Sequence, residues 1–193
     1  MKRFVLAITG ASGSPFGIRV LEELSKTAEV HLVISSNSFS IIRDETGLDW
    51  AEDTENTVRK HCGSDRIFFY ADRHMEAPIA SGSFRTDGMM VVPCSMKTLS
   101  GIAAGYAANL IERAADVTMK ERRSLLLSPR EMPFSAIHLE NMLKLARIGV
   151  TIAPPVPAFY HKPAGLEEMV DFIAGKILDT FGVEHTLFKR WGS

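Results

Sequence analysis

The chain has 193 residues, which is enough for one domain with a sizeable hydrophobic core. Its 22 lysines and arginines nearly balance its 23 aspartates and glutamates, so nothing favours a nucleic acid or an anionic membrane surface as a partner. No window approaches the ~20 apolar residues of a membrane-spanning helix, and Cys62 and Cys94 lack metal-ligand spacing, which favours a reducing, cytoplasmic setting.

The first predicted strand is Phe4 to Thr9, an apolar run bounded by glycine. The turn Gly10-Ala11-Ser12-Gly13 follows and leads into a predicted helix, with Ser14 as its N-cap and Pro15 at its first position. Such a helix start offers free backbone N–H groups to a phosphate. The turn matches neither the dinucleotide fingerprint nor a P-loop, because Ser12 replaces the second glycine, and a plain tight turn explains it about equally well.

The second predicted strand is Glu29 to Ile34, and small polar residues, Ser35 to Ser38, follow it. Simple helix capping is the plain alternative to ligand binding for these residues. A short predicted helix, Ser40 to Thr46, carries Glu45. By default, Glu45 is a surface glutamate.

A polar segment, a short strand and a long loop come next. Asp49 to Cys62 is predicted to be helical or partly irregular, and Ile67 to Tyr70 to be a strand. His74 to Arg85 is predicted to be a long loop with Ser81-Gly82-Ser83 in its middle. Long ordered loops often carry function, and small residues there let a flat ligand approach the backbone.

A buried-type apolar run, Met89 to Val92, predicts the next strand, which ends at Pro93. A polar turn, Cys94 to Thr98, then leads into a helix of small residues. Polar groups at the carboxyl end of a strand of a parallel sheet are where ligands bind in such folds. For Cys94 itself, a small buried residue is favoured over a nucleophile.

Another helix is predicted to begin at Asn109, whose spacing to Glu112 is that of a capping box. On this helix Asp116 and Lys120 are four residues apart, so an ordinary surface ion pair is the plain interpretation of Lys120. The remaining predicted elements are a strand at Leu125 to Leu127 that ends at Pro129-Arg130, a helix at Ala136 to Ile148 capped by Ser135, a strand at Val150 to Ala153, and a helix at Leu166 to Phe181. Lys176 lies off the apolar face of that last helix.

Strands and helices alternate throughout, which predicts a doubly wound parallel α/β sheet, a Rossmann-like or flavodoxin-like three-layer sandwich, in a single domain over residues 1–193. The polar residues that follow the strands should then gather at one edge of the sheet. They are Thr9-Gly10, Ser35, Cys94-Ser95, Pro129-Arg130 and Pro154. This convergence indicates a nucleotide-like ligand, without naming a reaction.

Several blocks also resemble the UbiX-type flavin prenyltransferases, formerly described as aromatic-acid decarboxylases. These blocks are TGASG, PIASGSFRTDGM, VVPCSMKTLSGIA, NLIERAADVTMKERR, PREMPFSAIHLENML, PPVPAFYH and the RW near the end, so the resemblance covers nearly the whole chain. It implies transfer of the dimethylallyl group of dimethylallyl monophosphate to N5 and C6 of reduced FMN, without a metal. It also implies a dodecamer with sites at subunit contacts, and delivery of prenylated FMN to a separate UbiD-type decarboxylase.

The resemblance assigns roles to individual residues. The implied FMN contacts are Gly10, Ala11, Ser12, Ser35, Ser95, Met96, Lys97, Thr98 and Arg130. The implied substrate contacts are Lys120, Tyr160 and Lys176, with Arg113 and Ser81 beside them and Trp191 from a neighbouring subunit. Many members have arginine where this chain has Lys176, and lysine keeps the charge but loses the bidentate fork.

Catalysis should need groups that stabilise the leaving phosphate and move protons. Lys120 is expected to stabilise the charge on the leaving phosphate. Glu131 is the first choice for proton transfer and Glu45 the second, with Ser12 as a relay. The C-terminal residues 166–193 are expected to contact neighbouring subunits.

Two other functions stay open. One is a flavin-dependent decarboxylase acting directly on an aromatic acid or a peptidyl cysteine. The related cysteine decarboxylases carry an Asn-containing turn and an early catalytic histidine, whereas this chain has PCSMKT and no histidine before His31. The other is a flavodoxin-like FMN-binding electron carrier, a class that is usually strongly acidic. The preference for a monophosphate or a diphosphate donor, and the pathway served, also stay open.

Overall fold

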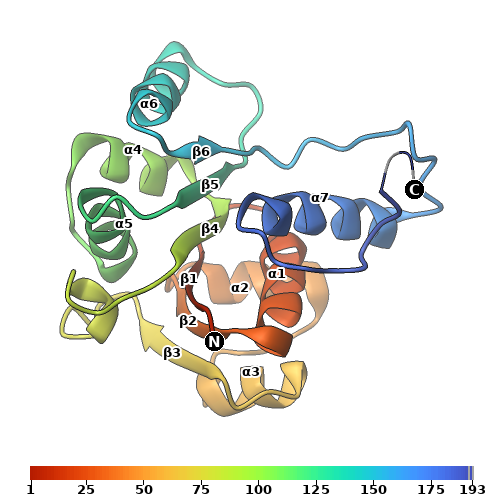
Figure 1. The fold of residues 1–193 in the computed structure, drawn as a ribbon, viewed down its shortest axis with the longest axis horizontal. Helices are drawn as coiled ribbons and strands as arrows, with labels where there is room; N and C mark the ends of the chain where they lie inside the picture. Colours follow the sequence, from red (N-terminus) through yellow and green to blue (C-terminus); the bar gives the residue numbers. More distant parts are fainter. Residues whose placement is uncertain (191, 193) are drawn as a thin grey trace.

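In the computed structural model, which describes residues 1–190 and 192, six parallel strands form one sheet in the order β3-β2-β1-β4-β5-β6 (Figure 1). The strands are β1 (Arg3–Ile8), β2 (Glu29–Ile34), β3 (Ile67–Ala71), β4 (Gly88–Cys94), β5 (Leu125–Pro129) and β6 (Thr151–Ile152). The helices are α1 (Ser14–Thr27), α2 (Ser38–Thr46), α3 (Thr54–Cys62), the 3₁₀ turn η1 (Pro78–Ala80), α4 (Met96–Ala104), α5 (Leu110–Lys120), α6 (Ala136–Arg147) and α7 (Leu166–Thr180). The predicted doubly wound parallel sheet is confirmed.

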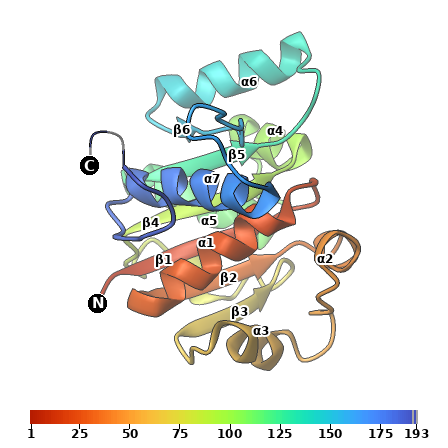
Figure 2. The same ribbon diagram turned by 90° about the vertical axis from the view of Figure 1, so that its right-hand side faces the viewer.

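Helices cover both faces of the sheet, because the strand side chains alternate between two apolar cores. Phe4, Leu6 and Ile8 of β1 belong to a core that also contains residues of α1 and α7. Val5 and Ala7 belong to a second core, which contains residues of α4, α5 and α6. In Figure 2, α1 and α7 lie in front of the sheet, and α4 and α5 lie behind it.

The strand order reverses between β1 and β4. The chain winds outward from β1 through β2 to β3, and then returns to the other side of β1 and continues through β4 and β5 to β6. At such a switch point the loops after the two central strands diverge and leave a crevice at the carboxyl edge. The loops concerned start at Thr9 and at Ser95.

Local sequence patterns predicted most boundaries well. The second strand is confirmed residue for residue, whereas the last strand is shorter than predicted, only Thr151–Ile152. Asn109 caps α5, because its side chain accepts from the N–H of Glu112 at 3.0 Å. The Glu112 carboxylate, however, accepts from the N–H of Ala108, one residue before the cap, and not from the N–H of Asn109. The capping box is therefore only half formed as predicted.

The predicted pair between Asp116 and Lys120 is wrong. Asp116 accepts from Arg113 Nη1 at 2.9 Å, and Lys120 pairs with its neighbour Glu121 instead. A second nearby cation, Arg113, and a second nearby acid, Glu121, therefore form the pairs in place of the expected one at a spacing of four residues.

After α7 the described chain folds back along this helix as far as residue 190 (Figure 1). Lys2 Nζ donates to the carbonyls of Phe181 and Gly182, both at 3.2 Å, which ties the end of α7 to the start of β1. Residues 185–190, which we call the tail segment, then pack against α7. None of the helices in the described part of the chain is long and apolar enough to cross a membrane.

Candidate active site

Hydrogen bonds join the loops at the carboxyl edge of the sheet into one surface. The Thr9 hydroxyl donates to the carbonyl of Pro93 at 2.8 Å and accepts from the N–H of Ser95 at 2.7 Å. The N–H of Arg130 donates to the carbonyl of Cys94 at 3.2 Å. The N–H of Ser35 donates to the carbonyl of Ile8 at 3.0 Å. The ends of β2, β1, β4 and β5 therefore present their polar loops side by side, as predicted, and we call this surface the carboxyl edge.

The turn after β1 is held from two sides. Gly10 and Ser12 are exposed, and Ala11 is buried. Arg130 Nε donates to the carbonyl of Ser12 at 3.3 Å, which fixes the guanidinium beside the turn. Gly13 caps α1 in the left-handed region, with φ 104°, so Ser14 is the first helical residue rather than the predicted cap.

The start of α1 does not offer its N–H groups to a phosphate, which corrects the sequence-based expectation. The carboxylate of Glu45 accepts from the N–H of Gly13 at 3.1 Å and from the N–H of Ser14 at 2.8 Å. It also accepts from the Ser14 hydroxyl at 2.7 Å. The carboxylate of Glu45 thus occupies the anion site that the N-terminus of α1 creates.

These contacts control the ionisation of Glu45. Desolvation by partial burial alone would raise the pKa of its carboxyl. Hydrogen bonds from the hydroxyls of Ser12 and Ser14, and from the N–H groups of Ser14 and Gly13, outweigh that effect and hold the pKa below its usual 4.5. Glu45 is therefore ionised at neutral pH, which favours a capping role over that of a proton donor.

The start of α4 is arranged differently. Ser95 is the N-cap and accepts from the N–H of Thr98 at 3.3 Å, while its hydroxyl lies 3.1 Å from the Thr98 hydroxyl. The N–H groups of Met96 and Lys97 belong to the first turn, where no helical carbonyl can accept from them. Lys97 is exposed and adds a positive charge. Backbone donors, two hydroxyls and a cation are what a phosphate site needs.

The two remaining edge residues lie at the surface. Ser35 is half-buried, and its hydroxyl lies 2.7 Å from that of Ser38, which in turn donates to the carbonyl of Ile8. Glu131 is exposed, and its carboxylate accepts from the N–H of Met132 at 3.0 Å. Glu131 directly follows Arg130, so its carboxylate starts from the same edge as the turn after β1.

Three predicted substrate contacts form a second group, which lies beside α5. Arg113 Nε donates to the carbonyl of Ala80 at 3.0 Å, next to Ser81. A Cβ added to Gly82 would lie only 2.8 Å from Lys120 Nζ, so the ammonium group rests against the loop backbone. We call Ser81, Arg113 and Lys120 the α5 group.

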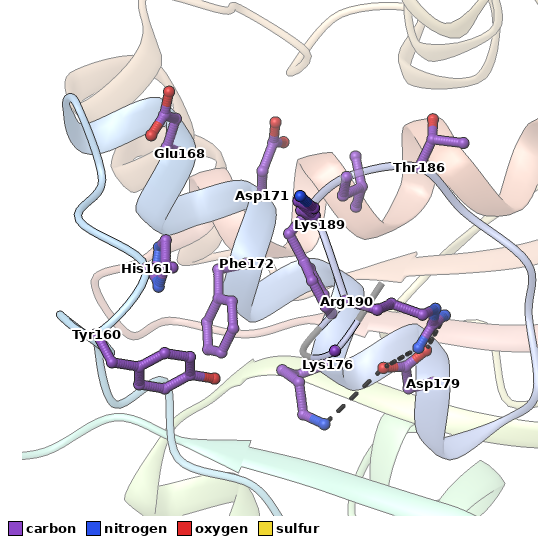
Figure 3. Close-up of a pocket in the computed structure, with 13 residues that line it drawn as sticks. Tyr160, His161, Glu168, Asp171, Phe172, Lys176, Asp179, Thr186, Lys189 and Arg190 are labelled. Atoms are coloured by element: carbon purple, nitrogen blue, oxygen red, sulfur yellow. Dashed lines mark hydrogen bonds and ion pairs between the residues drawn. The ribbon is translucent and has the colours of Figure 1, made fainter.

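Two more predicted substrate contacts, Tyr160 and Lys176, line a cavity of about 1010 Å³ between α7, the segment before it and the tail segment (Figure 3). We call this cavity the α7 pocket. It is lined by Tyr160, His161, Glu168, Asp171, Phe172, Lys176, Asp179, Thr186, Leu187, Phe188, Lys189, Arg190 and Gly192. Figure 3 shows the Tyr160 hydroxyl directed toward Lys176.

The pocket contains residues to which the sequence assigned no role. His161 stacks on Phe172, with ring centroids 4.6 Å apart, and both of its ring nitrogens are buried without a hydrogen-bond partner in the described structure. Asp179 binds both Arg190 and Lys176. The pair between Lys176 and Asp179 could have been predicted, because the two residues are three apart on one helix. The contact between Asp179 and Arg190 could not, because it depends on the fold of the tail segment.

The structure therefore sorts the predicted site residues into three groups. The carboxyl edge, the α5 group and the α7 pocket share no residue, and α5 and α7 pack on opposite faces of the sheet. Lys120, Tyr160 and Lys176 do not converge within one chain, and their convergence at a contact between copies stays a prediction. Trp191 lies outside the described residues. In the described part of the chain, no group of three His, Cys, Asp or Glu side chains is placed to hold a metal ion.

Comparison with known proteins places the chain among the flavoproteins. A family model of flavoproteins matches residues 1–178. The flavin prenyltransferase UbiX of Methanocaldococcus jannaschii is 48% identical, over 99% of both chains. The relative with the same name from Halalkalibacterium halodurans is 46% identical and covers 98% of this chain and 93% of its own length.

Solved structures agree in fold as well as in sequence. A dodecameric FMN-dependent UbiX-like decarboxylase from Escherichia coli O157:H7 superposes with a TM-score of 0.90 at 46% identity, covering 99% of this chain and all of the other. AnUbiX (PadA1), solved in complex with FMN and dimethylallyl pyrophosphate, also gives 0.90, at 45% identity and with 100% and 98% coverage. The chain therefore belongs to the flavoprotein family and, within it, to the UbiX flavin prenyltransferases.

Proposed function

We propose that this protein joins the dimethylallyl group of dimethylallyl monophosphate to reduced FMN. Its relatives at 46–48% identity carry the name flavin prenyltransferase over nearly the full length. The α7 pocket is the observation that carries the proposal, because Lys176 lies beside aromatic rings such as Phe172. A cation next to an apolar, π-rich wall suits an anionic prenyl ester. An electron carrier needs no such pocket, whereas an aromatic carboxylate would also fit it, so the name shared by the relatives is what favours the transferase over the decarboxylase.

The carboxyl edge fits FMN. Ser95 and Thr98, together with the first N–H groups of α4, suit a single phosphate, and Lys97 adds charge. The open backbone at Gly10 lets a flat ring approach, because a Cβ there would meet only Asn37 within 4 Å, at 3.5 Å. We assign FMN binding to these residues and to Ala11, Ser12, Ser35, Met96 and Arg130. Reduced FMN supplies the N5 and C6 atoms that accept the prenyl group.

The chain's own cations and hydroxyls handle the donor. Lys120, Lys176, Arg113 and the Tyr160 hydroxyl bind the donor phosphate and stabilise its charge as it leaves, and Ser81 supports them. Such contacts strengthen when negative charge builds up on the phosphate, so they lower the barrier rather than only tightening binding.

Proton transfer is assigned to Glu131. Glu131 directly follows Arg130 at the carboxyl edge, and its carboxylate is exposed on the surface to which we assign FMN. Glu45 is the weaker candidate, because its carboxylate is engaged in capping α1. Ser12 is assigned the role of a proton relay. Its hydroxyl donates to the Glu45 carboxylate, and its carbonyl accepts from Arg130, the neighbour of Glu131.

The separation of the three groups supports a site shared between copies of the chain. The α5 group of one copy can meet the α7 pocket of another only in an oligomer, and the UbiX-like relative from Escherichia coli is dodecameric. We therefore propose a homo-dodecamer in which residues 166–193 contact neighbouring subunits, with Trp191 as one contact. We further propose that the protein is cytoplasmic and that a UbiD-type decarboxylase uses its product.

The test is mass spectrometry of the flavin released after anaerobic incubation with reduced FMN and dimethylallyl monophosphate. We expect FMN enlarged by one dimethylallyl-derived unit, and much less of it with Lys176→Ala. Unmodified FMN from the wild-type protein would contradict the proposal. Carbon dioxide release from an aromatic acid without any prenyl donor would support direct decarboxylation instead.

A further inference from the structure

One carboxylate in the α7 pocket is shared by two full cations. Asp179 accepts from Arg190 twice, from Nη2 to Oδ1 at 2.7 Å and from Nη1 to Oδ2 at 3.2 Å. Lys176 Nζ lies 3.8 Å from the same Oδ2. Both cations are more than half exposed, so neither is held in place by burial. Two cations of the described chain therefore meet at one carboxylate at this end of the pocket.

The other carboxylates that line the pocket, Asp171 and Glu168, have partners of their own. Asp171 Oδ1 accepts from Arg19 Nε of α1 at 2.6 Å. Glu168 Oε2 accepts from the N–H of Ala164 at 2.8 Å. In Figure 3 both carboxylates lie at the opposite end of the pocket from Lys176. The end of the pocket that holds both Lys176 and Arg190 is therefore suited to a further anion from outside the chain.

The position of Arg190 is built into the packing of the tail segment. A Cβ on Gly175 of α7 would lie 2.5 Å from Phe188 Cε1 and 2.7 Å from His185 Cε1, so these two rings fit only against a glycine. Phe188 also packs on Phe172, with ring centroids 5.0 Å apart. The segment is thus seated on α7 immediately before Arg190, which places the guanidinium over the same helix as Lys176.

We propose that Arg190 is a binding residue for the donor phosphate, acting together with Lys176 and the Tyr160 hydroxyl; this rests on the proposed function. A phosphate monoester carries a charge of about −1.5 to −2 near neutral pH and offers three acceptor oxygens. One lysine, a point charge on a flexible stem, cannot satisfy it. Arginine adds a second charge and a planar set of donors that matches phosphate oxygens. Phe172 and Phe188 face the apolar part of the same ligand.

The experiment measures dissociation constants for inorganic phosphate and for dimethylallyl monophosphate by calorimetry on the FMN-loaded protein. Arg190→Ala should weaken both by roughly tenfold to a hundredfold, the scale of a charge-assisted contact. Arg190→Lys should lose less, because it keeps the charge. The matched control Arg43→Ala removes an exposed arginine from α2 and should change neither constant by more than about twofold.

A neutral probe, 3-methyl-2-buten-1-ol, separates phosphate binding from a structural role. The proposal predicts that Arg190→Ala leaves binding of this alcohol unchanged. Unchanged phosphate binding in Arg190→Ala, or equal weakening in Arg43→Ala, overturns the proposal. So does an equal loss for the alcohol, since that would mean that Arg190 only shapes the pocket. If the wild-type protein made no prenylated flavin, the proposed function would fail, while phosphate binding would still decide the role of Arg190.

Discussion

Removing the carboxylate of Glu45 should destabilise the protein through the start of α1. In the structure this carboxylate receives two backbone N–H groups, of Gly13 and Ser14, and the Ser14 hydroxyl. Loss of a helix N-cap costs about 0.5–2 kcal/mol, and hydrogen bonds to a charged group contribute about 1.5–3 kcal/mol. Because Glu45 is exposed to solvent, we expect Glu45→Ala to cost about 1–2 kcal/mol.

The assay is thermal unfolding followed by circular dichroism at fixed protein concentration. For a chain of this length the expected loss lowers Tm by about 2–8 °C. The pKa of the Glu45 carboxyl is held below its usual 4.5, so its stabilisation is present above that pH and is lost as the pH falls through the lowered value. The difference between wild type and variant should therefore close below about pH 4.5.

Asp44→Ala is the matched control, because Asp44 is an exposed acid on the same helix, α2. It should shift Tm by less than about 1 °C. If Glu45→Ala left Tm unchanged while slowing product formation, the capping argument would be refuted, and Glu45 would return as an acid–base candidate.

Three further predictions follow from the site and the core. Glu131→Gln should leave FMN affinity nearly intact but slow prenylated flavin formation by ~10²-fold or more, measured by rapid quench; a wild-type rate would make Glu131 structural. Ser95→Ala should weaken FMN binding by roughly tenfold in a fluorescence titration, and NAD should not compete; comparable NAD affinity would refute the single-phosphate site. Burial lowers the pKa of the His31 ring below 6.5 although Glu29 opposes this, so stability should fall as the pH drops below 6.5. His31→Gln should flatten that pH dependence of Tm, and an unchanged slope would show that other groups cause it.

The fold was readable from the sequence because both faces of a parallel sheet are buried. Strands such as Gly88–Cys94 are then short continuous apolar runs between turn residues, and their position follows from that pattern. Helix starts were readable where a local side chain caps them, as Ser135 caps α6. The bounds of the last strand could not be predicted in this way, because Val150 and Ala153 lie outside the pairing between β5 and β6.

The site was readable only in part, because some of its contacts join distant segments. The residues at the carboxyl edge follow strands, so their gathering at one edge is a consequence of topology. The bond between Glu45 and the turn after β1 joins residues 31 positions apart, and no local pattern encodes it. The separation of Lys120 from Lys176 depends on which face of the sheet each helix covers.

Mixing two inactive variants tests most directly whether the site is shared between copies. Co-expressed Lys120→Ala and Lys176→Ala chains, purified as mixed oligomers through two different tags, would be assayed for prenylated FMN by mass spectrometry. If each site takes Lys120 from one copy and Lys176 from another, random assembly restores both lysines in about a quarter of the sites, and activity should recover to that extent. Mixing Tyr160→Phe with Lys176→Ala, two changes in the same α7 pocket, should restore nothing. No recovery with Lys120→Ala and Lys176→Ala would contradict the shared site.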